Sequence, residues 1–316
     1  MTSVIESDDS VFRDCLGRSA FSFGHRLADH PLFDLDRLAR LAEKVVHGPY
    51  AGKSILLDAH NAEAQTKFST MAAYDLQGDT ITEIERAALW LKLSSVEKSD
   101  KDYADLLQSI LCDIEALSGV PLRCEITWSG MTIVVSSPGI TTPYHIDHEY
   151  NFLLQIRGEK NVNLLDGADR EILSAREIEA FYVNDFDAPS FRDESRVKSR
   201  CFHLAPGIGV HQPPLAPHWV QNCENLSISV SIMFCTRELN ARAKVFQANH
   251  FLRSLGFAPL EPSASPLSDR LKTFSLGLLS KHRPKDYHEM LYSGVERLQA
   301  PVKFARRLRH RQPTSP

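Results

Sequence analysis

TPYHIDHEYNFLLQIRGEK, residues 142–160, contains a run of β-forming residues at 151–156 that ends in a turn at Arg157-Gly158-Glu159. A second such run, 160–165, begins directly after the turn. Further runs of this kind occur at 131–136, 201–204 and 226–234, separated by Gly, Pro and Asp. Short strands interrupted by turn residues predict a small barrel or sandwich over residues 123–236.

The run at 226–232, LSISVSI, alternates strictly between apolar residues and serines. In a strand, this pattern places Leu, Ile, Val and Ile on one face and three serines on the other. The serine face has two interpretations. It either meets solvent, or, in a barrel flanked by helices, it lines an interior with room for a polar ligand while the apolar face packs on the helices.

Helical patterns flank the predicted barrel on both sides. Apolar residues recur at three- and four-residue steps over 35–45 and 103–117, and again after Arg237, behind Pro266 and near Tyr287. We therefore predict an α+β protein with three segments. These are a mainly helical segment 1–122 that packs on the barrel, the barrel core 123–236, and a C-terminal helical segment 237–316. A homodimer through the C-terminal helices is expected.

Charge and cysteine content narrow the class of protein. The chain has 316 residues with 36 basic and 40 acidic side chains, a net charge of −4 that gives no general attraction for nucleic acid. The basic residues clustered within 303–311 are interpreted as a solvated terminus in preference to a phosphate or membrane contact. The six cysteines are scattered without a CxxC motif, which favours a reducing cytoplasm. We expect no export signal and no membrane span.

His145 and Asp147 form an HxD pair in a β context. Residues two apart in a strand project from the same face, so both side chains can reach one metal ion. A third ligand from a later strand would complete two imidazoles and a carboxylate on one face of the metal, the arrangement typical of non-haem Fe(II) oxygenases. HxD alone is a weak signal, because such short pairs arise often by chance.

Two histidines are candidates for the third ligand. His218 opens an apolar strand after the proline-stiffened turn that precedes it, whereas His211 comes before that turn. We favour His218, since the turn would fix the direction of its side chain. His148, next to Asp147, has the opposite strand parity and is interpreted as a structural or supporting residue.

Residues 128–235 resemble the Jumonji C (JmjC) or cupin-like Fe(II)/2-oxoglutarate oxygenases, and in particular the asparaginyl hydroxylase of hypoxia-inducible factor. The matching segments are TPYHIDHEYNFLLQIRGEK, PPLAPHWVQN and LSISVSIMF, in that order. The resemblance implies a double-stranded β-helix, the jelly roll of the cupins. It also implies Fe(II) as cofactor, with 2-oxoglutarate and dioxygen as cosubstrates.

The same resemblance implies roles for individual residues. His145, Asp147 and His218 would hold the iron as catalytic metal ligands. Lys160 and Thr142 would bind the distal carboxylate of 2-oxoglutarate. Asn151 and Ser231 would lie near the cosubstrate, although Ser231 stands where the asparaginyl hydroxylase has an asparagine. A tyrosine that binds 2-oxoglutarate in some relatives has no counterpart in the matched residues.

Lys160 fits this role on physical grounds as well. It begins the strand that returns after the turn, and a lysine that points into a barrel interior needs an anionic partner, which a dicarboxylate held by iron would supply. The alternative is an exposed lysine at a strand end. The leading hypothesis is therefore an oxygenase that hydroxylates an unactivated C–H bond and releases succinate and CO₂.

Two other functions remain open from the sequence. One is a cupin-like metal-binding or regulatory protein without turnover; the other is a metal-dependent isomerase or a dioxygenase that does not use 2-oxoglutarate. The substrate class is also open, because a protein side chain, a methylated lysine, a sugar and a small metabolite all fit the fold. The carboxylate of Asp147 implies hydroxylation, or demethylation of an N-methyl group, in preference to halogenation. Between the first two, simple hydroxylation is favoured.

Overall fold

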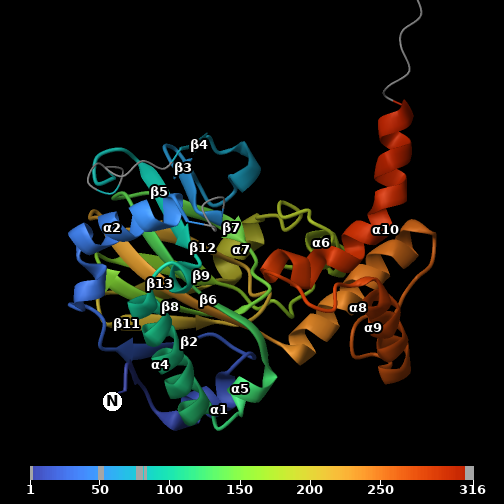
Figure 1. The fold of residues 1–316 in the computed structure, drawn as a ribbon, viewed down its shortest axis with the longest axis horizontal. Coiled ribbons are helices and arrows are strands. Elements are labelled where there is room, and N and C mark those ends of the chain that lie inside the picture. Colours follow the sequence, from blue (N-terminus) through green and yellow to red (C-terminus); the bar gives the residue numbers. More distant parts are fainter. Residues whose placement is uncertain (1–2, 49–52, 76–80, 82–83, 310–316) are drawn as a thin grey trace, which may run out of the picture. The chain divides into compact units, whose positions relative to one another are not determined.

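The computed structural model describes residues 3–48, 53–75, 81 and 84–309, with residues 301–309 described only as helix. The chain divides into two compact units, each considered by itself below. The first comprises Met1–Leu173 and Pro189–Thr236, and the second comprises Ser174–Ala188 and Arg237–Pro316. Figure 1 shows the arrangement of helices and strands.

The first unit contains two antiparallel sheets. The larger has the strand order β1-β2-β11-β8-β13-β6-β5-β3-β4 and the smaller has the order β10-β9-β12-β7. The strands of the larger sheet are β1 Ile5–Glu6, β2 Phe21–His25, β3 Ile55–Asp58, β4 Ala73–Tyr74, β5 Leu89–Ser94, β6 Ile126–Ser136, β8 Tyr150–Arg157, β11 Ile208–Gln212 and β13 Ser227–Thr236. Those of the smaller sheet are β7 Thr141–His145, β9 Lys160–Leu164, β10 Arg200–Leu204 and β12 His218–Asn222.

Strands β6 to β13 cross repeatedly between the two sheets. Strands β6, β8, β11 and β13 lie side by side in the large sheet, and β7, β9, β10 and β12 make up the small one. This connectivity is that of a jelly roll, in which two sheets face each other across a shared interior. The predicted α+β fold with a double-stranded β-helix core is confirmed.

Helices cover the outer face of the large sheet. The helices of the first unit are α1 Asp9–Cys15, α2 Leu35–Val46, α4 Lys101–Ser118, α5 Leu122–Glu125 and α7 Asp193–Lys198, with 3₁₀ turns η1 Pro31–Phe33, η3 Phe68–Thr70 and η4 Val96–Lys98. Helix α4 begins after Asp100, whose side chain accepts a hydrogen bond from the amide of Asp102, and ends at Gly119 with φ +69°. Leu38 of α2, Ile110 of α4 and Val230 of β13 belong to one buried apolar cluster.

The serines of β13 face the opposite way, into the space between the sheets, and are buried. Ser229 donates a hydrogen bond to the side-chain oxygen of Gln155, 2.7 Å away, and the amide nitrogen of Gln155 donates to Ser227 over 3.0 Å. Ser231 donates to the side-chain oxygen of Asn151 over 2.6 Å. Of the two interpretations of the alternating strand, the structure therefore supports the interior one.

Residues 1–122 differ from the predicted mainly helical segment in one respect. They contribute β1, β2, β5, β3 and β4, which extend the large sheet at both edges, in addition to helices that pack on it. These strands are two to six residues long. Runs this short carry too few alternating positions for periodicity to separate strand from turn.

The second unit consists of α6 Ala175–Phe181, α8 Arg237–Ser254, α9 Pro266–Leu279 and α10 Tyr287–Arg309. Arg253 forms an ion pair with buried Glu179, 2.9 Å away. The predicted helices after Arg237, behind Pro266 and near Tyr287 are present. Helix α9 exposes an apolar stripe made of Leu267, Leu271, Phe274 and Leu278. The side chains of the basic tail lie outside the described residues.

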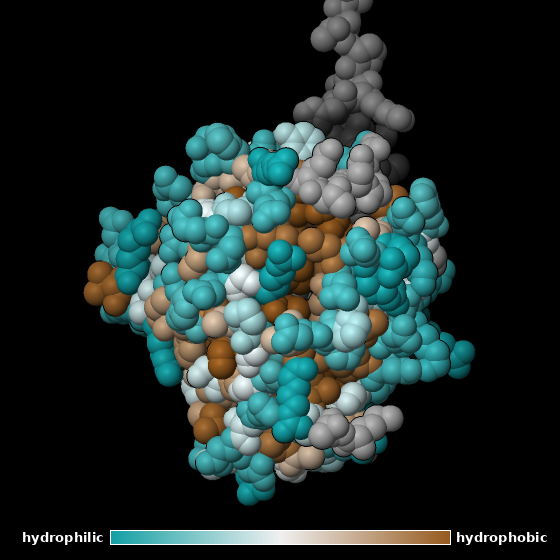
Figure 2. Space-filling model, turned by 90° about the vertical axis from the view of Figure 1, so that its left-hand side faces the viewer, coloured by the Kyte–Doolittle hydropathy of each residue, from teal (hydrophilic) through white to brown (hydrophobic). Residues whose placement is uncertain are grey.

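The face of the molecule in Figure 2 carries mainly hydrophilic residues, with hydrophobic ones gathered in the recesses between them. Among the helices of the described ranges, none is long and apolar enough to cross a membrane.

Phe12 of α1 tests the packing of the N-terminal helices on the large sheet. Its ring is fully buried and lies 4.9 Å from the ring of Phe21 and 5.8 Å from that of Phe152. We expect Phe12→Ala to lower the free energy of unfolding by about 3–5 kcal/mol. Val197→Ala, at an exposed position of α7, should change it by less than about 0.5 kcal/mol. Equilibrium urea unfolding measures both, and equal effects would contradict this packing.

Candidate metal centre

The structure brings together the three side chains that the sequence predicts as metal ligands. The ligand atoms of His145, Asp147 and His218 all lie within 4.8 Å of one another. His145 ends β7, Asp147 follows it, and His218 begins β12. His145 and His218 are direct cross-strand partners, so their side chains project from the same face of the small sheet.

Both imidazoles are oriented by backbone carbonyl groups. The Nδ1 atom of His145 lies 2.7 Å from the carbonyl oxygen of Pro143, and that of His218 lies 3.0 Å from the carbonyl oxygen of Ala216. A carbonyl only accepts hydrogen bonds, so Nδ1 carries the proton in each ring and Nε2 keeps its lone pair. Nε2 of His218 is 3.8 Å from a carboxylate oxygen of Asp147. This is the orientation that metal-binding histidines show.

The protonation states of two of these residues also suit a divalent cation. Burial, assisted by the neighbouring His218, lowers the pKa of His145 to about 4, so this imidazole is neutral at pH 7. Burial alone would raise the pKa of Asp147, but His145, His218 and the charge of Lys92 together lower it below its usual value. A neutral imidazole beside an ionised carboxylate is ready to bind a metal without losing a proton.

His211 lies outside this cluster. It is fully buried on β11, where Nε2 accepts a hydrogen bond from the amide of Gly17 over 3.0 Å and Nδ1 lies 3.1 Å from the carbonyl oxygen of Asn151. Its ring stacks on Phe152 at 4.5 Å, and burial lowers its pKa to about 3. Both ring nitrogens of His211 therefore have protein partners. This supports His218, and not His211, as the third metal ligand. His148 is buried and also lies outside the cluster.

A β-bulge places Thr142 on the same face as His145, although the two residues are three positions apart. Opposite Trp219, β7 has the two residues Pro143 and Tyr144, and the register then resumes with Val220 opposite Thr142. The bulge restores the parity that a regular strand would lose. Thr142 is thus in the position expected for a residue that binds a ligand between the sheets.

Lys160 also faces the space between the sheets. It starts β9 and shares the strand parity of Val162 and Leu164, which belong to the apolar cluster between the sheets. The residue is only 3% exposed, and burial lowers the pKa of its ammonium group to about 7. Within the described ranges, no carboxylate forms an ion pair with it. A buried cation of this kind is costly until an anion reaches it.

Asn151 and Ser231 form a hydrogen-bonded group near Asp147. The side chain of Asn151 donates to Gln212 over 2.9 Å and accepts from Ser231, and its proximity contributes to the lowered pKa of Asp147. Both residues are buried. Their hydrogen bonds to each other and to Gln212 fix the side chain of Asn151 on the inner face.

Two further residues beside the cluster were not predicted from the sequence. Lys92 of β5 is half-buried, lies opposite Val134 of β6, and its charge acts on both His145 and Asp147. Phe68, in η3, places its ring at 90° to that of His145, with centroids 5.3 Å apart. Lys92 is the one charged residue in the otherwise mainly apolar segment LWLKLS, residues 89–94, and this could have marked it as a candidate site residue. Phe68 lies in a turn that carries no periodic pattern.

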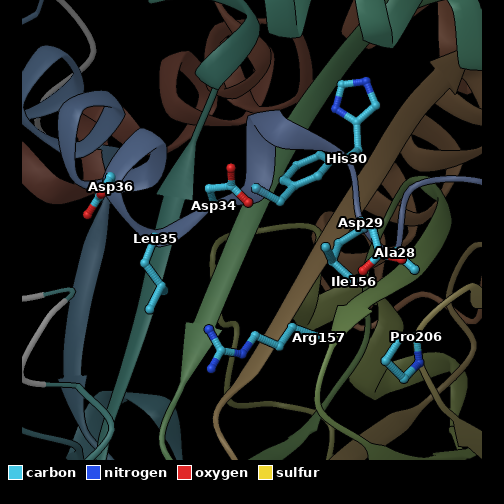
Figure 3. Close-up of a pocket in the computed structure, with 10 residues that line it drawn as sticks. Ala28, Asp29, His30, Asp34, Leu35, Asp36, Ile156, Arg157 and Pro206 are labelled. Carbon is cyan, nitrogen blue, oxygen red and sulfur yellow. The ribbon is translucent and has the colours of Figure 1, made fainter.

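A pocket of about 640 Å³ lies elsewhere on the first unit. Figure 3 shows its lining residues, which come from the segment 28–36 and from Ile156, Arg157 and Pro206. None of the predicted site residues lines this pocket.

No protein-family model matches the chain, and no curated protein matches it. Among solved structures, the chain is similar to Escherichia coli YcfD, with 15% sequence identity and a TM-score of 0.47 over 96% of this chain and 68% of that one. A structure described as YcfD, a ribosomal oxygenase from Escherichia coli, in complex with cobalt and 2-oxoglutarate has 15% identity and a TM-score of 0.46, over 94% and 65% of the two chains. The DMSP lyase DddQ from Ruegeria pomeroyi has 13% identity and a TM-score of 0.23 over 35% and 40%.

The chain thus spans about two thirds of the length of YcfD. At these levels of similarity the matches are distant, and the fold is identified by the strand order described above. The finer resemblance to the asparaginyl hydroxylase stays a prediction.

Substitution of the two histidines separates the alternative ligand sets. His218→Ala removes an oriented Nε2 from the cluster, so we expect Fe(II) affinity to fall by at least about tenfold. His211→Ala should leave Fe(II) affinity within about threefold while lowering the melting temperature, because it removes a buried stacked ring and a partner of Gly17. Anaerobic equilibrium dialysis with Fe(II) measures the affinities. Loss of binding in His211→Ala with retention in His218→Ala would reverse the assignment.

Proposed function

We propose that this protein is an Fe(II)- and 2-oxoglutarate-dependent oxygenase that hydroxylates an unactivated C–H bond. The observation that carries the proposal is the cluster of His145, Asp147 and His218 on an inner sheet face that also presents buried Lys160. Two imidazoles and one carboxylate are the donor set of non-haem Fe(II) oxygenases. When bound, iron would supply the activation of dioxygen that amino-acid side chains cannot provide.

The residues of this chain would divide the remaining tasks among them. His145, Asp147 and His218 would hold the iron, and Asn151 would keep the carboxylate of Asp147 oriented with the help of Ser231. Lys160 and Thr142 would bind the distal carboxylate of 2-oxoglutarate. An ammonium ion buried between sheets forms a strong charge-assisted hydrogen bond with such a group. These assignments make 2-oxoglutarate the anion that Lys160 requires.

Phe68 would protect one side of the site from water. Its ring lies edge-on to His145 and 5.9 Å from the ring of Trp90, which together with Ile140 belongs to a small apolar cluster. Excluding water strengthens the electrostatic interactions within a site and limits side reactions. The substrate itself, a small molecule, a sugar or a protein side chain, is not identified by these residues. Hydroxylation is proposed over demethylation.

The alternative function is a cupin-like metal-binding or regulatory protein without oxygenase turnover. It would use the same three metal ligands but would have no need for a cation at Lys160. The burial of a lysine that has no carboxylate partner in the described part of the chain favours the oxygenase, because a protein that binds metal alone gains nothing from the cost of desolvating an ammonium group.

Cytoplasmic localisation and a homodimer belong to the same proposal. All six cysteines are free, as is usual for proteins of a reducing compartment. The exposed stripe of α9 has spacings of four, three and four residues, so its members lie along one side of the helix. A second copy of this helix would cover such a stripe, as expected for association through the C-terminal helices.

Turnover of 2-oxoglutarate tests the proposed function. With Fe(II), dioxygen and ascorbate, the protein should convert 2-oxoglutarate to succinate and CO₂ slowly alone and faster with a substrate from a metabolite and peptide library. Asp147→Ala should abolish the conversion, because it removes the carboxylate ligand. Mass spectrometry detects succinate and any product with one oxygen atom from labelled dioxygen. Stoichiometric iron binding without succinate would favour the alternative function.

Lys160→Met tests the cosubstrate site without a large change in volume. We expect affinity for 2-oxoglutarate to fall by about ten- to a hundredfold, since a hydrogen bond to a charged group contributes about 1.5–3 kcal/mol. Iron affinity should stay unchanged in Lys160→Met. The control variant Lys101→Met, on the outer helix α4, should bind 2-oxoglutarate as tightly as the wild-type protein does. Isothermal titration calorimetry with Mn(II) in place of Fe(II) measures these affinities.

The pH dependence of this binding has a definite sign. Because burial lowers the pKa of Lys160 to about 7, the ammonium form that binds a carboxylate is lost as pH rises above this value. Affinity of the wild-type protein should therefore weaken by up to about tenfold per pH unit above 7, with a proton taken up on binding. In Lys160→Met this dependence should disappear. Unchanged affinity and pH dependence in the variant would place the cosubstrate elsewhere.

A further inference from the structure

A second cluster of metal-binding side chains lies on the outer side of the small sheet. Glu159 precedes β9, His203 lies on β10 and Cys223 follows β12, and their ligand atoms all lie within 4.8 Å of one another. His203 alternates with Phe202 and Leu204, which belong to the apolar cluster between the sheets, so its own side chain faces outward. The cluster is therefore separate from the candidate iron ligands, which face inward.

The ring of His203 lies between the side chains of Asn161 and Glu159. Its Nδ1 atom lies 3.0 Å from the side-chain oxygen of Asn161, and Nε2 lies 3.3 Å from a carboxylate oxygen of Glu159. When Nδ1 donates its proton to Asn161, the neutral ring directs the lone pair of Nε2 at another lone pair. A proton or a metal ion between the two atoms would stabilise this arrangement.

The one distance known between two of these atoms is compatible with tetrahedral zinc. Ligand nitrogen and oxygen atoms about 2.0–2.2 Å from Zn²⁺ and separated by the tetrahedral angle lie about 3.4 Å apart. The distance between Nε2 of His203 and the Glu159 oxygen is 3.3 Å. A thiolate sulfur, about 2.3 Å from the metal, would lie about 3.6 Å from each of them, within the limit that the cluster already satisfies.

Backbone contacts hold the parts of the cluster together before any ion binds. The amide of Cys223 donates to the carbonyl oxygen of Glu159 over 2.9 Å, and the amide of Glu159 donates to the side chain of Asn225 over 3.0 Å. Gly158 has φ +71°, and a Cβ there would lie 2.3 Å from the carbonyl oxygen of Leu226. Glycine is thus required for the two turns to approach this closely. A site with a fixed backbone loses little conformational entropy when a metal binds.

We propose that Glu159, His203 and Cys223 bind a zinc ion, with water as the fourth ligand. Imidazole and thiolate favour Zn²⁺ over Mg²⁺ and Ca²⁺, which prefer sets of oxygen ligands. Binding releases the thiol proton of Cys223 to solvent, and the sulfur forms the bond to zinc without any change of oxidation state. The ion joins the ends of β9, β10 and β12 and stabilises the turn directly before Lys160.

Cobalt spectroscopy tests this site apart from the candidate iron centre. The experiment uses full-length His145→Ala/His218→Ala protein, so that the inner cluster cannot bind the probe. Co²⁺ should bind with one equivalent, produce a near-ultraviolet thiolate-to-cobalt charge-transfer band, and be displaced by Zn²⁺. The band should disappear in Cys223→Ser. It should persist in Cys201→Ser, a matched control on the same outward side of β10, two residues from His203.

A second measurement addresses His203 and Glu159. In the same His145→Ala/His218→Ala background, His203→Gln and Glu159→Gln should each weaken Zn²⁺ binding by at least tenfold, as measured by competition with a chromophoric chelator. Zn²⁺ should raise the melting temperature only when Glu159, His203 and Cys223 are all present. A thiolate band that survives Cys223→Ser, or zinc affinity unchanged in both other variants, would overturn the proposal. Neither outcome depends on succinate formation by the wild-type protein. The zinc site and the proposed oxygenase activity are therefore tested independently.

Discussion

The pairing of β7 with β12 is the constraint on which the candidate metal centre depends. The direct opposition of His145 and His218 brings together two imidazoles that are far apart in the chain, and their rings are 4.1 Å apart. A slip of one residue in this pairing would turn one of them to the outer face. The bulge opposite Trp219 then recovers the inner face for Thr142. Register and bulge together therefore place four of the predicted site residues: the two histidines, Asp147 just after β7, and Thr142.

The polar side chains inside the jelly roll are of two kinds: some are hydrogen-bonded to one another, and Lys160 has no carboxylate partner in the described ranges. Gln155 exchanges hydrogen bonds with Ser227 and Ser229, so this end of β13 is a closed network that gives the two sheets a specific fit. Ser231, Asn151 and Gln212 form a second hydrogen-bonded network. The networks stabilise the packing between the sheets, and the proposed function assigns Lys160 to a ligand.

Much of this arrangement could be predicted from particular residues. The alternation in LSISVSI predicted both faces of β13, and the HxD pair with His218 predicted the cluster. Periodicity could not reveal β3, β4 or β5, because strands of two to six residues show little alternation and are stabilised by pairing that only the tertiary structure supplies. Lys92 and Phe68 reach the site through those strands and turns, and so escaped prediction. Glu159, His203 and Cys223 have no motif spacing, since three different strand ends bring them together.

Both faces of the small sheet thus carry a cluster of side chains that could bind a metal, one facing the large sheet and one facing solvent. The central claim of the proposed function is that the inward-facing cluster holds a metal beside a carboxylate bound to Lys160. Anomalous diffraction at the manganese edge, from crystals grown anaerobically with Mn(II) and 2-oxoglutarate, tests it most directly. We expect a single strong peak bonded to His145, Asp147 and His218, with the distal carboxylate of 2-oxoglutarate at the ammonium group of Lys160. A peak bonded to other residues, or a carboxylate directed away from Lys160, would contradict this claim.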